Sequence, residues 1–170
     1  MEEEFSLTTL STQIDKVVET GKIEPSISRV FDNIIKKCLD SERYWSSNEK
    51  ISNKASFTLY HATRNCRIIL EKMRERFEEA VTRKENPEIA VLSLRVLPDL
   101  NGLCDLITSL KGDTISSNMA TFVMNRVRGL RSIAREVNML PSPEEEIQTV
   151  DKKDLKKHFG RFMDSLQEIL

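Results

Sequence analysis

Apolar residues recur every three or four positions along most of this chain, which is the spacing of one face of an α-helix. The chain has only five glycines and five prolines, fewer turn residues than a β-rich fold usually needs. We therefore predict an all-α protein, a single compact bundle of five or six mostly antiparallel helices spanning residues 1–170. The predicted helices cover residues 3–20, 25–45, 53–84, 87–110, 116–137 and 151–170.

Helix-terminating residues support these boundaries, and one proline disturbs them. Gly21 follows the first helix as a plausible C-terminal stop, and Pro25 suits the first turn of the second. The fourth helix is apolar nearly all round, so we expect it to be the central buried helix, with Leu100 and Leu103 in the core. Pro98 predicts a kink or break in that helix. A short array of helical repeats stays open as an alternative topology.

The composition excludes several classes of protein. Hydrophobic residues make up 39% and charged residues 31%, which argues against both a disordered chain and a membrane protein. The formal net charge of -1 gives no global field toward nucleic acid or anionic membrane. The first residues are acidic, unlike a signal peptide, and no apolar run is long enough to span a bilayer, so we expect no membrane insertion.

Three cysteines, Cys38, Cys66 and Cys104, lie far apart in the sequence and are flanked by apolar residues. That pattern resembles neither a disulfide framework nor a paired-cysteine metal site. We expect reduced, buried thiols, which suits an intracellular location in the cytoplasm or nucleus.

Motifs that carry enzymatic chemistry are missing from the sequence. The two histidines, His61 and His158, have no acidic or cysteine partner three or four residues later, so a zinc site has little support. Glycine-rich phosphate loops and serine nucleophile motifs are also absent. We therefore expect no enzyme, with no catalytic residues, no cofactor and no bound metal.

One face of the third helix is the strongest candidate for recognition. Phe57, Tyr60, Arg64 and Ile68 point away from the stripe that contains Leu59. Aromatic, arginine and aliphatic side chains together are typical of interface hot spots. The competing interpretation is burial of this face under neighbouring segments.

Basic residues form a second candidate. Arg128, Arg131 and Arg135 share one face of the fifth helix, and four lysines cluster between residues 152 and 157. The ordinary interpretation of such residues is a solvated helix face. The acidic connection at 141–149 is a third feature, either a rigid linker or a regulatory segment.

Together these observations favour a non-enzymatic protein–protein interaction module, a small adaptor or a subunit of a larger complex, that binds another protein through an exposed helix face. The alternative is a helical bundle that binds nucleic acid or acidic phosphate groups through Arg128, Arg131 and Arg135. Nucleic acid is the less favoured partner, because net positive charge and aromatic platforms are lacking. The sequence also leaves a homo-oligomer open.

Overall fold

Amphipathic periodicity produces five helices in the part of the chain that the structure describes. The computed structural model describes residues 7–47, 53–83 and 88–141. These residues form helices and connections without a β-strand, which confirms the all-α prediction; the predicted sixth helix, 151–170, lies outside them. The helices are α1 (Thr8–Thr20), α2 (Ile27–Ser47), α3 (Asn53–Arg83), α4 (Glu88–Ser109) and α5 (Ser117–Glu136).

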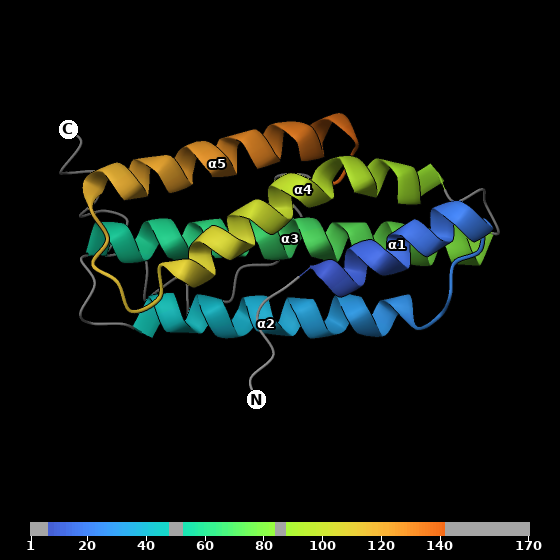
Figure 1. Ribbon diagram of the computed structural model, residues 1–170, viewed down its shortest axis with the longest axis horizontal. Helices are drawn as coiled ribbons and strands as arrows, with labels where there is room; N and C mark the ends of the chain where they lie inside the picture. Colours follow the sequence, from blue (N-terminus) through green and yellow to red (C-terminus); the bar gives the residue numbers. More distant parts are fainter. Residues whose placement is uncertain (1–6, 48–52, 84–87, 142–170) are drawn as a thin grey trace.

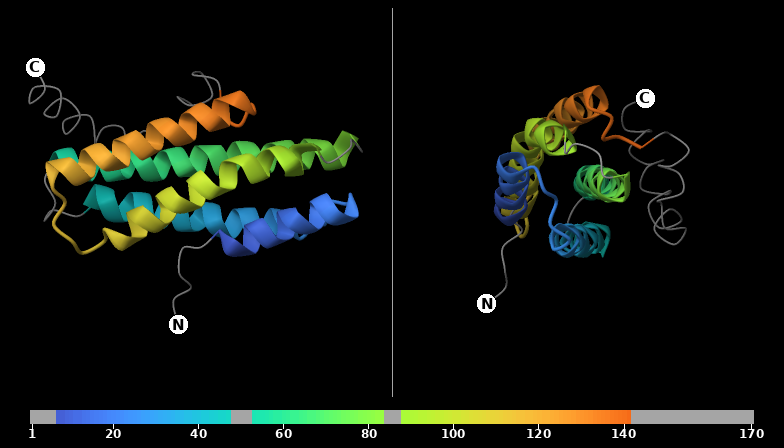
Figure 2. Two further views of the ribbon diagram at one scale, coloured as in Figure 1. Left: turned by 45° about the horizontal axis from the view of Figure 1, so that its top comes forward. Right: turned by 90° about the vertical axis from the view of Figure 1, so that its right-hand side faces the viewer.

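The longest helix, α3, lies at the centre of the bundle and contacts α2, α4 and α5 (Figure 1). The fourth helix also contacts three others, α1, α3 and α5, so it shares the central position with α3. One side of α4 is exposed, and Val91 and Arg95 lie there. Successive helices run antiparallel, whereas α3 and α5 run in the same direction (Figures 1 and 2).

Side chains from all five helices share one hydrophobic core. Leu100 and Leu103 are fully buried in it, as predicted. Phe31 and Phe77 pack against each other there, with ring centroids 5.6 Å apart. The three thiols are free and buried, also as predicted. Burial raises the pKa of the Cys38 and Cys104 thiols, so these groups stay protonated and unreactive.

Pro98 does not break the fourth helix, which continues from Glu88 to Ser109. The side chain of Pro98 is exposed. The carbonyl of Leu94, which loses its usual N–H partner four residues later, therefore lies on the side of the helix that water can reach. Of the predicted kink or break, the break is wrong, because the helix is continuous and solvent can replace the missing hydrogen bond; the kink stays a prediction.

A buried ion pair joins α2 to α3. Arg67 donates hydrogen bonds to both carboxylate oxygens of Glu42, at 2.7 and 3.0 Å, and to Glu71 at 3.2 Å. Burial alone would lower the pKa of Arg67, but these two carboxylates raise it above its ordinary value. The guanidinium is therefore charged, and the bidentate geometry fixes the register of the two helices.

Candidate interaction site

The predicted recognition face of α3 is not an open surface. Ile68 is 1% exposed and Tyr60 is 7% exposed. Phe57 and Arg64 are half-buried. The Phe57 ring stacks on His61, with centroids 6.0 Å apart. We name these four predicted residues, Phe57, Tyr60, Arg64 and Ile68, the back face of α3.

The prediction of an exposed back face is therefore wrong at Tyr60 and Ile68. The angular step of a helix places Ile68 opposite the core stripe, and Ile68 is not part of the continuous core cluster, whereas Tyr60 is part of it. That step cannot show what lies over a face. Burial of an apolar face away from the core is a tertiary property, so periodicity alone does not predict it.

The arginine stripe of α5 is divided between solvent and the bundle. Arg131 donates a hydrogen bond to the Oδ1 atom of Asn65 on α3. Arg128 and Arg135 are exposed, and Arg128 lies 3.4 Å from Asn125 Oδ1 on its own helix. The shared helical face does not make these arginines equivalent, because the middle one contributes to helix packing.

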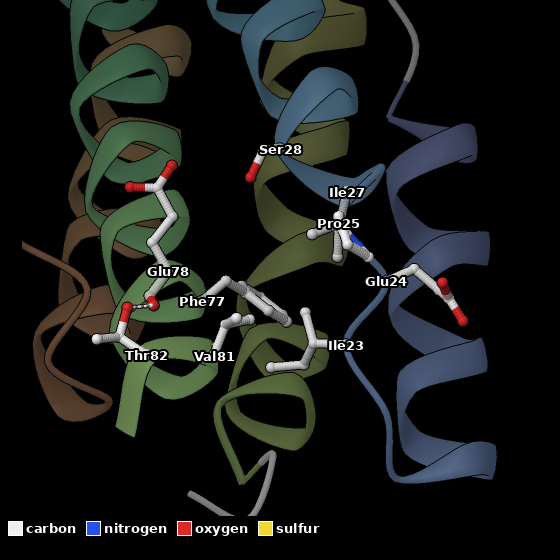
Figure 3. A pocket seen from close by; sticks show the side chains of 9 residues that line it. All are labelled: Ile23, Glu24, Pro25, Ile27, Ser28, Phe77, Glu78, Val81 and Thr82. Atoms are coloured by element: carbon white, nitrogen blue, oxygen red, sulfur yellow. Dashed lines mark hydrogen bonds between the residues drawn. The ribbon is translucent and has the colours of Figure 1, made fainter. Parts of the chain in front are cut away.

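An open groove with a mainly apolar lining lies at one end of the bundle. Its volume is about 240 Å³. It lies between the α1–α2 connection with the start of α2 on one side and the last turns of α3 on the other (Figure 3). The lining residues are Ile23, Glu24, Pro25, Ile27, Ser28, Phe77, Glu78, Val81 and Thr82. We name this site the end groove.

Local chain geometry creates the end groove. Gly21 ends α1 in the left-handed region, at φ +70°, and its N–H donates to the Val17 carbonyl at 2.8 Å. This conformation, which glycine adopts at little cost, turns the chain toward α2. Ile23 and Pro25 follow in the connection and lie opposite the last turns of α3.

Apolar side chains occupy the middle of the end groove. Figure 3 shows Phe77, Val81 and Ile23 directed toward one another. Phe77 is buried and packs on Phe31 behind it, so it forms the floor, whereas Val81 is 50% exposed and forms part of the wall. Helical spacing places Val81 in line with the buried Phe77, yet Val81 is exposed, so spacing alone does not give its environment.

Both charged residues that line the end groove are glutamates. Glu24 lies on the connection and Glu78 on α3, and their carboxylates point away from the apolar centre in different directions (Figure 3). Two separated carboxylates around an apolar floor suit a ligand with an apolar centre and positive charge around it. The sequence signal for this site was weak, because its residues come from a connection and a helix end.

The described residues contain no group of three histidine, cysteine or acidic side chains arranged to hold a metal ion. None of their helices is both long and apolar enough to cross a membrane. No protein-family model, curated protein or solved structure matches this chain.

Proposed function

We propose that this chain is a non-enzymatic protein-interaction module, an adaptor or a subunit of a complex, that binds its partner at the end groove. The partner segment we envisage presents one large apolar side chain flanked by lysine or arginine. One observation supports this function above the others: Val81, 50% exposed, stands beside a buried aromatic floor in an apolar depression.

The size of the end groove agrees with a side-chain anchor. Its volume is about 240 Å³, and a cavity of roughly 150 Å³ can hold a benzene ring. One aromatic or branched aliphatic side chain would therefore fill most of it, whereas pockets for drug-sized ligands run from about 300 Å³ upward. Interface energy is typically concentrated in such anchors that fill a pocket on the partner.

The chemistry of the lining supports binding over catalysis. The lining residues include no histidine, cysteine or lysine, and the two glutamates diverge. A general acid–base pair would instead need groups that converge within hydrogen-bonding reach of one reacting atom. The two glutamates are better placed to attract basic residues of the partner, next to its apolar anchor, than to act as a catalytic pair.

The test is selection of peptides from a random display library on the full chain, followed by affinity measurement with purified variants. We expect selected peptides to carry one large apolar residue with neighbouring basic residues. Val81→Asp should weaken their binding about tenfold or more, because it places a charge beside the anchor. The matched control is Phe122→Asp, since Phe122 on α5 is also 50% exposed but lies outside the end groove.

Two results would count against this function. Equal binding to the Val81→Asp variant and to the unmodified chain would remove the end groove as the site. Binding that survives Val81→Asp but falls steeply with salt, and falls further in Arg128→Gln with Arg135→Gln, would favour the phosphate-binding alternative.

A further inference from the structure

The back face of α3 is buried although no other described helix lies over it. Figure 2, viewed along the bundle, shows the other four helices above, below and to the left of α3, with none of them on its right. Contacts identify the flanks: Arg67 reaches Glu42 of α2, and Asn65 accepts from Arg131 of α5. With a step of roughly 100° per residue, Ile68 lies between these flanks on the side opposite the core.

The back face is more deeply buried than a helix face in contact with solvent would be. Ile68 is 1% exposed and is not part of the continuous core cluster. Tyr60, two turns earlier, is 7% exposed and also belongs to the core cluster, so Ile68 is the residue whose burial the core does not explain. Further along the same face, Glu75 is exposed. The burial of this face therefore extends over the first half of α3 and ends before Glu75.

We propose that residues 151–170 of the same chain bind in cis along the back face of α3. This segment lies outside the described residues, and its sequence supplies the apolar groups that the face requires. Its apolar residues recur at helical spacing, which gives one continuous stripe. The members of that stripe are Leu155, Phe159, Phe162, Met163, Leu166 and Leu170.

The other undescribed segments do not supply such a cover. Residues 48–52 and 84–87 contain one isoleucine and one proline between them as apolar groups, and residues 1–6 contain only Met1 and Phe5 as apolar groups beside three glutamates. The position of the chain at residue 141 also suits the proposal. Arg76 of α3 donates to the Val137 carbonyl at 2.6 Å, so α5 ends beside α3.

The connection is long enough to reach the back face. Ile68 lies eight residues from Arg76 along α3, which is roughly 12 Å at 1.5 Å per residue. The nine residues 142–150 can span up to about 30 Å when extended. Binding in cis therefore requires no rearrangement of the five described helices, and any external partner for this face would have to displace residues 151–170.

Tyrosine nitration tests the proposal on the full chain, which has only two tyrosines, Tyr44 and Tyr60. Tyr60 lies on the back face, whereas Tyr44 is half-buried on α2 and its hydroxyl accepts from the Gly112 N–H at 3.0 Å. In Phe159→Ser with Phe162→Ser we expect Tyr60 to react with tetranitromethane about tenfold faster or more. The rate at Tyr44 should stay unchanged, and Phe122→Ser should alter neither rate.

An unchanged Tyr60 rate in the double variant would overturn the proposal. If Tyr60 in the unmodified chain instead becomes reactive on dilution, the cover comes from a second copy, and the binding in cis is wrong. If both tyrosines accelerate together, the reciprocal experiment decides: Ile68→Asp should speed amide exchange over residues 151–170 while leaving α2 protected. Exchange over 151–170 that does not change in Ile68→Asp contradicts the proposal.

Discussion

The middle and the C-terminal half of α3 each carry an apolar residue and a paired arginine, but these residues have different surroundings. In the middle, Ile68 is buried and Arg67 forms a buried pair with Glu42. Near the end, Val81 is half exposed and Arg74 pairs with Asp32 at the surface. Each half therefore carries an apolar residue outside the core and an arginine paired with α2. Of these four residues, only the two in the middle of α3 are buried.

This difference separates two kinds of contribution. A sealed side chain contributes to the free energy of unfolding, because its apolar area leaves water on folding. An exposed apolar side chain contributes little to folding and remains available for a partner. The middle of α3 therefore stabilises the fold, and we propose that its C-terminal end binds the partner.

The largest expected effect concerns the two ion pairs. Arg67→Met should lower the free energy of unfolding by about 3–5 kcal/mol, because it leaves the buried Glu42 carboxylate without its partner. Arg74→Met should cost less than about 1 kcal/mol, since the pair with Asp32 is solvated. Urea denaturation of both variants gives the comparison. Equal costs would show that the middle of α3 is no better sealed than its end.

Truncation of Ile68 and of Val81 should change the free energy of unfolding by different amounts. Ile68→Ala should cost about 2–5 kcal/mol of unfolding free energy, the range for a buried isoleucine. Val81→Ala should stay within about 0.5 kcal/mol, as exposed substitutions do. Thermal and urea unfolding measure both. A loss below about 1 kcal/mol for Ile68→Ala would mean that its cover contributes no packing energy.

The bundle itself was predictable from the sequence, because helical periodicity and terminating residues are local. Gly21 marked the end of the first helix. The range expected for α3 differs from the observed one by one residue, at its C-terminal end, and the range expected for α4 differs by one residue at each end. Burial of Leu100 and of the three cysteines followed from apolar surroundings. Such properties depend on residues within a few positions of each other.

The candidate site was not predictable, because its residues come from a helix end and a connection that lie far apart in the sequence. Val81 continues the apolar spacing of α3, but spacing does not show which neighbours reach a given position, and Val81 is 50% exposed. Ile23 lies in a connection that carries no periodic signal. The prediction that the back face is exposed failed for the opposite reason. Ile68 lies on the side of α3 away from the core, and periodicity does not show that this side is buried.

The smallest expected effect sharpens the contrast within the arginine stripe. Arg131→Gln should cost about 1 kcal/mol of unfolding free energy, because the fully buried Asn65 loses its hydrogen-bond donor. Arg128→Gln and Arg135→Gln should change it by less than about 0.5 kcal/mol, since both side chains are exposed. Calorimetry of the three single variants distinguishes them. Identical costs would mean that the stripe acts as one solvated face.

The most direct test of the account measures peptide affinity beside stability in two variants of α3. A selected peptide carrying an apolar anchor and basic flanks is titrated into Val81→Ala and Ile68→Val, with anisotropy as the readout. The account predicts weaker binding with unchanged unfolding for Val81→Ala, and unchanged binding with reduced stability for Ile68→Val. Weaker binding in Ile68→Val together with full affinity in Val81→Ala would contradict it.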